Sequence, residues 1–142
     1  VIFRLEDEYY GAEIQNTPEV ILPETPTRVP NNPDFIEGVI DYRGEVIPVL
    51  DLKKRFKLGA VEYTKDAKFI VVQMGDKYIA IIVDEVIEIL RSDTENIEEP
   101  PEMTRIGKEY ITGVVRMDDR LVILLDLSKV LTVDEQEILE AL

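Results

Sequence analysis

The chain has 142 residues, of which 45% are hydrophobic, a formal charge of −14, and neither His nor Cys. This length fits one domain or two very small ones, and without Cys there is no disulfide, thiol nucleophile or zinc–thiolate site. The negative charge argues against nucleic acid and anionic lipid as partners, because both bind positive surfaces. No apolar run is long enough to cross a bilayer, so we expect a cytoplasmic protein without membrane insertion.

Short runs rich in β-branched and aromatic residues, bounded by turn residues, recur along the whole chain and predict an all-β fold. In chain order, the predicted strands are 1–5, 9–14, 19–22, 39–42, 46–50, 69–74, 78–83, 86–91, 110–117 and 121–125.

The segments between these strands predict loops and short helices. Four prolines in 23–33 require an extended loop, and the polar stretch 57–68 reads as a linker. Asp51 can accept backbone N–H groups at the start of a helical turn over 52–56. Thr132 and Glu135 form a capping box, which predicts a C-terminal helix.

Two long stretches of the chain occur twice. Residues 38–56 return as 113–131 at a shift of 75, and residues 1–21 return as 70–90 at a shift of 69. The identical pairs include Gly38 and Gly113, Val39 and Val114, Leu50 and Leu125, Asp51 and Asp126, Asp7 and Asp76, Tyr9 and Tyr78, and Glu19 and Glu88. The shift increases along the chain from 69 to 75, which places a six-residue insertion between 90 and 110.

An internal repeat of this kind indicates repeated architecture. We therefore expect tandem β-rich modules at about 1–59 and 61–131, with 132–142 unplaced, within one domain that spans 1–142. Modules of this size are marginal alone, so the two are expected to share apolar surface.

The residues offer little for catalysis. His is absent, and neither Ser lies in a nucleophile elbow. No phosphate-binding glycine loop occurs, and the acidic clusters lack calcium-loop spacing. Asp51 and Asp126 each follow a strand and precede a helical turn, which favours capping over a carboxylate pair. We therefore expect no enzyme, no cofactor and no metal; a catalytic or small-ligand double β-barrel would need a pocket lined with converging polar groups.

Arg43 stands at the tip of the predicted hairpin, next to Gly44. It can be an ordinary exposed arginine, or it can be fixed by Glu19, whose strand precedes the hairpin. In the second copy Glu88 replaces Glu19, but Asp118 replaces Arg43, so the two copies would present different faces.

The run FIEGVIDYRGEVIPVLDLKKRF, residues 35–56, resembles the signature of the CheW family of chemotaxis coupling proteins, F-I-x-G-V-x-N-L-R-G-x-x-x-P-V-x-D-L. The matching residues are Phe35, Ile36, Gly38, Val39, Arg43, Gly44, Pro48, Val49, Asp51 and Leu52. The resemblance extends along essentially the whole chain, through Tyr10-Gly11, Thr27 to Pro30, Val83 to Val86, and Thr112 to Asp126. It implies two five-stranded barrels of the Src-homology-3 type, related by a pseudo-two-fold axis and packed on an apolar seam.

The same resemblance implies an adaptor that links chemoreceptor cytoplasmic tips to the histidine kinase CheA. The kinase's regulatory domain would dock barrel to barrel, and the receptor tip would lie between the two barrels. The residues expected to bind or shape partners are Glu19, Val20, Val39, Arg43 and Gly44, with a salt bridge between Glu19 and Arg43. Alternatives within the family are a domain cut from CheA or from a CheV-type protein; the acidic C-terminal helix favours a standalone coupler.

Kinase contact is expected chiefly on the second module, because the hairpin of that module is more apolar at the matched positions than the hairpin of the first. Met117, Leu121 and Ile123 stand there in place of Tyr42, Val46 and Pro48. Any of these side chains left exposed would form an apolar patch of the kind that marks a partner.

Overall fold

The computed structural model describes residues 1–12, 19–30, 33–74, 76–88, 97–98, 110–117 and 120–129. Within this part of the chain the strands are β1 (Ile2–Leu5), β2 (Glu8–Ala12), β3 (Glu19–Ile21), β4 (Ile36–Tyr42), β5 (Glu45–Asp51), β6 (Lys68–Met74), β7 (Lys77–Val83), β8 (Glu85–Glu88), β9 (Ile97–Glu98), β10 (Ile111–Met117) and β11 (Arg120–Leu125). Two short helical elements accompany them, α1 (Leu52–Arg55) and the 3-10 helix η3 (Leu127–Lys129). The predicted helix after Thr132 and the segment 132–142 lie outside the described residues.

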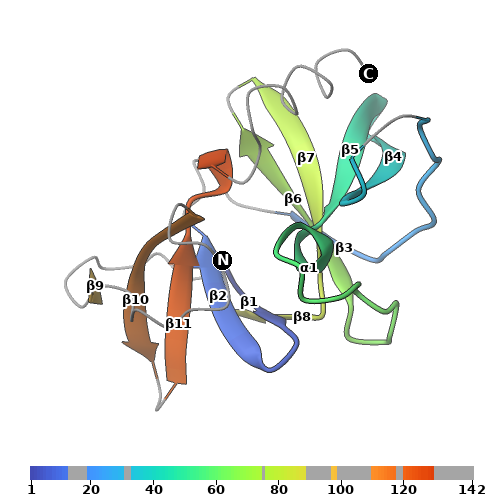
Figure 1. The fold of residues 1–142 in the computed structure, drawn as a ribbon. Helices are drawn as coiled ribbons and strands as arrows, with labels where there is room; N and C mark the ends of the chain where they lie inside the picture. The colour runs from blue at the N-terminus through green and yellow to red at the C-terminus, as the bar shows by residue number, and fades with distance from the viewer. Residues whose placement is uncertain are drawn as a thin grey trace.

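The strands form two sheets, which make up the two lobes seen in Figure 1. Sheet A has the order β8-β1-β2-β11-β10-β9, and sheet B has the order β3-β6-β7-β5-β4. Five strands of sheet A correspond one to one with those of sheet B, and the two-residue β9 is the sixth. The predicted all-β, two-lobed fold with short helical turns is therefore confirmed.

The pairing registers of the two sheets obey the shifts found in the sequence. In each sheet an antiparallel hairpin carries an irregularity just before a glycine, and a parallel pair joins that hairpin to another one. The matched parallel partners are Val49 with Ala80 and Leu50 with Ile81 in sheet B, and Leu124 with Gly11 and Leu125 with Ala12 in sheet A. These partners are related by shifts of 75 and 69, so the repeat in the sequence is a pseudo-two-fold repeat in the structure.

Backbone hydrogen bonds outside the sheets follow the same symmetry. The Asp51 N–H donates to the Phe35 carbonyl at 2.7 Å, and the Asp126 N–H donates to the Tyr110 carbonyl at 2.9 Å. Both bonds link the end of a hairpin to the residue before its first strand.

The expected division into sequential modules at about 1–59 and 61–131 is wrong for the sheets. Sheet B consists of one unbroken segment, 19–83, whereas sheet A combines 1–12 with 85–125. The first hairpin of each copy thus joins the second hairpin of the other copy. The sequence could not reveal this, because a repeat identifies equivalent strands and leaves open which copy supplies each partner.

A short segment closes each lobe beside the hairpin that follows it in the chain. In sheet B, Thr27 pairs with Val39, and in sheet A, Glu98 pairs with Val114. Thr27 and Glu98 are 71 positions apart in the sequence. This shift is larger than the shift of 69 that relates β3 to β8 and smaller than the shift of 75 that relates β4 to β10. The six-residue insertion is therefore split, with two residues before the closing segment of sheet A and four after it.

Strands β6 and β7 are buried on both faces. Ile70 and Ile81 face the cluster shared by the two sheets, whereas Phe69 and Ile82 face the interior of sheet B. This two-sided burial explains why FIVV and IAIIV are continuous apolar runs rather than alternating ones. Each side chain of this size that is fully buried contributes about 1.5–3 kcal/mol.

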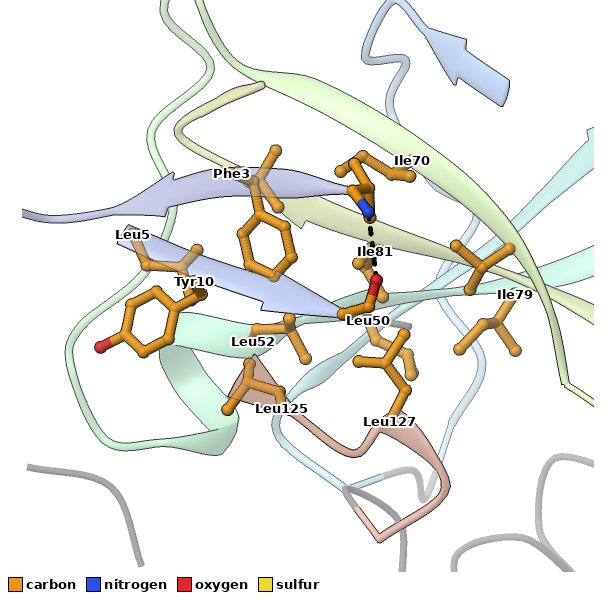
Figure 2. Close-up of a cluster of buried hydrophobic side chains, with 14 of the residues drawn as sticks. Phe3, Leu5, Tyr10, Leu50, Leu52, Ile70, Ile79, Ile81, Leu125 and Leu127 are labelled. Atoms are coloured by element: carbon orange, nitrogen blue, oxygen red, sulfur yellow. Dashed lines mark hydrogen bonds between the residues drawn. The ribbon is translucent and has the colours of Figure 1, made fainter. Parts of the chain in front are cut away.

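The shared cluster is the seam that joins the lobes. Figure 2 shows side chains from both sheets converging there, and none of those labelled is more than 8% exposed. Its labelled members are Phe3, Leu5, Tyr10, Leu125 and Leu127 from the sheet A segments, and Leu50, Leu52, Ile70, Ile79 and Ile81 from the sheet B segment. The expectation of a shared apolar surface is confirmed.

Candidate partner-binding surface

The tip of the β4–β5 hairpin is a tight two-residue turn. Arg43 has φ 51° and Gly44 has φ 84°. Positive φ at both central residues is the geometry of a type I′ hairpin turn, which follows the twist of the flanking strands. The Asp41 carboxylate accepts the Gly44 N–H at 3.0 Å and holds the turn closed. The backbone therefore fixes the direction in which Arg43 leaves the sheet.

The predicted salt bridge between Glu19 and Arg43 is present. Arg43 Nη2 lies 2.7 Å from Glu19 Oε2, which joins the hairpin tip to β3 at the far edge of the sheet order. The Tyr42 hydroxyl donates to the same Glu19 oxygen. The Arg43 guanidinium also lies 5.1 Å from the centre of the Tyr42 ring. The three side chains form a closed group, which we call the tip group.

The tip group contributes to shape more than to stability. The Arg43 side chain is 73% exposed and that of Glu19 is 38% exposed, and exposed pairs of this kind contribute about 0–1 kcal/mol. The hydrogen bond to Glu19 raises the pKa of Tyr42, with a smaller contribution from burial, while Arg43 opposes the rise. At neutral pH the Tyr42 phenol is therefore neutral, and it contacts both the Glu19 carboxylate and the Arg43 guanidinium.

The role of Tyr42 is not predicted from the sequence. Its ring also packs against Tyr78, with centroids 5.9 Å apart, so the tip group extends onto the β6–β7 hairpin. The signal available was an aromatic residue directly before a turn-tip arginine, since such a ring can stack under the guanidinium.

The outer face of the same hairpin carries an apolar strip. Val39 lies opposite Pro48 in the register, and Val46 is on the same side by strand alternation. Val39 is half-buried, whereas Val46 is 63% exposed. Val20, in β3, is also half-buried. The structure thus places Arg43 and Gly44 at the tip of the first hairpin and Val39 on its outer face, with Glu19 and Val20 in β3.

The three candidates on the second hairpin differ in accessibility. Leu121 is 48% exposed, whereas Ile123 is half-buried and packs against the seam. The side chain of Met117 lies outside the described part of the structure. Leu121 is no more exposed than the matched Val46, so exposure does not distinguish the second hairpin from the first.

Asp51 has a structural task, as its position in the sequence predicted. Its carboxylate caps α1 by accepting the Lys54 N–H at 3.2 Å and accepts the Val61 N–H at 3.0 Å. The residue is 2% exposed. Burial raises the pKa of this carboxyl, although the backbone N–H groups oppose the shift.

The described residues contain neither a metal-binding cluster nor a membrane-spanning helix. No group of three or more His, Cys, Asp or Glu residues in this part of the chain could hold a metal ion. No helix among the same residues is long and apolar enough to cross a bilayer.

Comparison with known proteins gives a match over nearly the whole length. The family model described as the CheW-like domain matches residues 1–135. The chain belongs to the CheW-like domain family. Among curated relatives, it is 34% identical to the chemotaxis protein CheW of Klebsiella aerogenes, covering 99% of this chain and 85% of that protein. It is 31% identical to the chemotaxis protein CheW of Treponema pallidum, covering 95% of this chain and 82% of that protein.

A solved structure agrees with this assignment. The CheW-like chain superposes on the crystal structure of the scaffolding protein TtCheW from Thermoanaerobacter tengcongensis with a TM-score of 0.84 and 38% identity. The match covers 95% of this chain and 88% of that one. At this level of similarity the two chains share the CheW-like fold.

Proposed function

We propose that this CheW-like chain is a non-catalytic adaptor that couples the cytoplasmic tips of chemoreceptors to the histidine kinase CheA. The observation that carries the proposal is the match over nearly the whole chain to proteins named chemotaxis protein CheW, and to one named a scaffolding protein. These names favour a coupling protein over a domain of the kinase. The chain has no His or Cys, and the side chains of its tip group are held in place on the surface. Both features fit a function exerted through the surface.

We assign the shaping of the partner surface to Glu19, Arg43 and Gly44. The turn fixes the backbone, and the ion pair fixes the guanidinium, which is a planar donor with several N–H groups. Val20 and Val39 supply apolar contact beside the tip group.

Kinase contact is assigned to Leu121 first, because it is the more exposed of the two candidates whose side chains the structure describes. Met117 and Ile123 complete the proposed contact. Leu121→Glu should therefore weaken capture of the kinase domain, and unchanged capture would remove this assignment.

The direct test is co-purification with the regulatory domain of CheA, with and without a receptor tip fragment. We expect binary capture of the kinase domain and increased retention when the receptor tip is added. Absence of binding to either partner at micromolar concentration would contradict the proposal.

A sharper test uses the charges of the tip group. Arg43→Glu should weaken binding to both partners, while thermal unfolding stays nearly unchanged because the pair is exposed. The double variant Glu19→Arg with Arg43→Glu should recover part of the binding if the mutual geometry matters. Lys65→Glu, at an exposed position in another loop, is the matched charge reversal and should bind normally. No recovery in the double variant would mean that each residue contacts the partners directly.

A further inference from the structure

Lys53 is a buried lysine at the junction of the two lobes. Its side chain is 6% exposed, and its ammonium group pairs with the carboxylate of Glu6 and, at 3.3 Å, with that of Asp84. Burial of an unpaired ammonium group is strongly unfavourable. Burial lowers the pKa of Lys53, but the two carboxylates outweigh this and hold its pKa above the usual value. The Lys53 ammonium group therefore keeps its positive charge at neutral pH, next to two acidic side chains.

The three members of this triad come from three different parts of the fold. Lys53 lies in α1, which directly follows β5 of sheet B, whereas Glu6 lies in the β1–β2 turn of sheet A. Asp84 stands between β7 of sheet B and β8 of sheet A, on the connection between the lobes. The triad thus joins both lobes and the chain that links them.

Backbone contacts hold the turn of sheet A in place for this contact. Asp84 Oδ2 accepts the Glu6 N–H at 2.7 Å, and the Asp84 N–H donates to the Arg4 carbonyl at 3.0 Å. Arg4 Nη1 donates to the Glu6 carbonyl at 2.7 Å. Glu6 itself has φ 55°, an uncommon conformation for a residue other than glycine. Such a conformation persists where surrounding contacts determine it.

The pseudo-two-fold repeat does not reproduce the triad. At the shifts of 75 and 69, Lys53 corresponds to Ser128, Glu6 to Gly75 and Asp84 to Gln15. None of these residue types carries a charge, so the ionic contact belongs to one side of the seam.

We propose that Lys53, Glu6 and Asp84 form a latch that sets the orientation of the two lobes relative to each other. The apolar seam attracts without direction, because burial depends on area, whereas charge-assisted hydrogen bonds depend on geometry. Lys53 is then a positioning residue for the surface between the lobes. Its effect on partner binding rests on the proposed function, but its effect on orientation does not.

The test measures the distance between the lobes in the isolated protein. Because the chain has no Cys, Glu45→Cys in sheet B and Thr112→Cys in sheet A provide two unique sites for nitroxide labels, both exposed. Double electron–electron resonance then reports the distribution of distances between the labels. The latch is removed with Lys53→Met and Asp84→Asn together, which leaves no buried charge unpaired. The asparagine oxygen can still accept the Glu6 N–H.

The matched control removes an ion pair within one lobe. Lys54 neighbours Lys53 in α1, and its ammonium lies 2.6 Å from Glu37 in β4, so both partners belong to the sheet B segment. Lys54→Met with Glu37→Gln makes the same change of charge without touching the junction.

We expect the latch variant to broaden or shift the distance distribution, with a Tm within about 4 °C of the parent, while the control keeps the parent distribution. Glu6→Gln changes the member of the triad whose side chain is 41% exposed and should broaden the distance distribution to an intermediate extent. This variant replaces the double variant in the test if the double variant does not fold. A parent-like distribution in the latch variant, or in Glu6→Gln if only that variant folds, would overturn the proposal. Equal broadening in latch variant and control would also overturn it.

Partner affinity should fall about fivefold or more in the latch variant. Broadening of the distance distribution without that loss of affinity would support the latch and contradict its link to the proposed function.

Discussion

Sheets A and B share one pairing pattern but fill their interiors differently. In sheet B the parallel partners are Val49 and Ala80, and in sheet A the matched partners are Leu124 and Gly11. A Cβ added to Gly11 would lie 3.0 Å from Leu124 Cδ2, so the larger leucine occupies the space that the glycine leaves. The two pairs contain the same number of side-chain carbon atoms.

This difference shows which features the repeat preserves. The irregularity before the glycine, the aspartate after the strand and the register are common to both sheets, because they fix the backbone. Interior volume is conserved for the pair rather than for each residue, as expected where packing density is high and uniform. Polar contacts are free to diverge, as the exposed tip group and the buried latch illustrate.

The largest effect is expected at the glycine that begins this shared pattern. Gly38 has φ 146°, and an added Cβ would lie 2.8 Å from the Thr27 carbonyl carbon and 3.1 Å from Pro26 Cβ. Gly38→Ala should lower the free energy of unfolding by about 3 kcal/mol or more, measured by urea unfolding with circular dichroism. Gly113→Ala tests whether sheet A depends equally on its matched glycine.

Gly44→Ala provides the control for this substitution. Gly44 also has positive φ, but an added Cβ would meet nothing within 4 Å, so the loss should be about 1 kcal/mol. Equal losses at Gly38 and Gly44 would show that conformation, and not the contact with Thr27, determines the effect.

The next effect concerns the caps. Asp51→Ala should lower the free energy of unfolding by about 2 kcal/mol, because two backbone N–H groups lose their acceptor in a buried place. The matched Asp126 is half-buried, so its surroundings are more accessible to water and Asp126→Ala should have a smaller effect. A larger loss at Asp126 in the same urea unfolding measurements would reverse this order of the two sheets.

A third prediction tests the compensation between matched pairs. Gly11→Ala should lower the free energy of unfolding by about 1–2 kcal/mol through overpacking against Leu124. Adding Leu124→Val recreates the pair found in sheet B and should restore most of the loss, whereas Leu124→Val alone should cost about 1 kcal/mol. Strictly additive losses in this double-mutant cycle would mean that the two residues do not share one space.

The smallest effect on stability is expected at the tip group. Arg43→Ala should change the free energy of unfolding by less than about 1 kcal/mol. Glu19→Ala should bring the raised pKa of Tyr42 back toward its usual value. An NMR titration of the tyrosine ring measures this change. The folded state keeps this proton to higher pH than the unfolded chain, so the stabilisation is complete below a pH of about 10 and is lost as the pH rises through the raised pKa. A Tyr42 pKa that ignores Glu19 would mean that the hydrogen bond is absent in solution.

The sequence was sufficient for much of the fold because repeats and hairpin turns leave local signals. The shifts of 75 and 69, the cap at Asp51 and the turn at Arg43-Gly44 all follow from residue types at fixed spacing. The assignment of strands to sheets did not follow, because pairing between distant segments leaves no local signal when both copies have the same pattern.

The candidate site was predicted in part. The pair of Glu19 and Arg43 was expected from the turn and the resemblance, but the share of Tyr42 in it depends on a ring placement that only coordinates provide. The latch was also missed. Lys53, Glu6 and Asp84 look like ordinary surface charges in the sequence, and their burial results from the contact between lobes.

The order of the segments has a consequence for how the molecule is made. Every strand of sheet B is available once residue 83 has left the ribosome, whereas Tyr9 in β2 must wait for its partner Val122 in β11. A folded 19–83 segment also shortens the effective loop between these two strands, which lowers the entropy lost when they pair. Pulse-labelled hydrogen exchange should therefore find the amides of β6 and β7 protected before those of β2 and β11. The β1–β2 hairpin is synthesised before sheet B and is set in place after it.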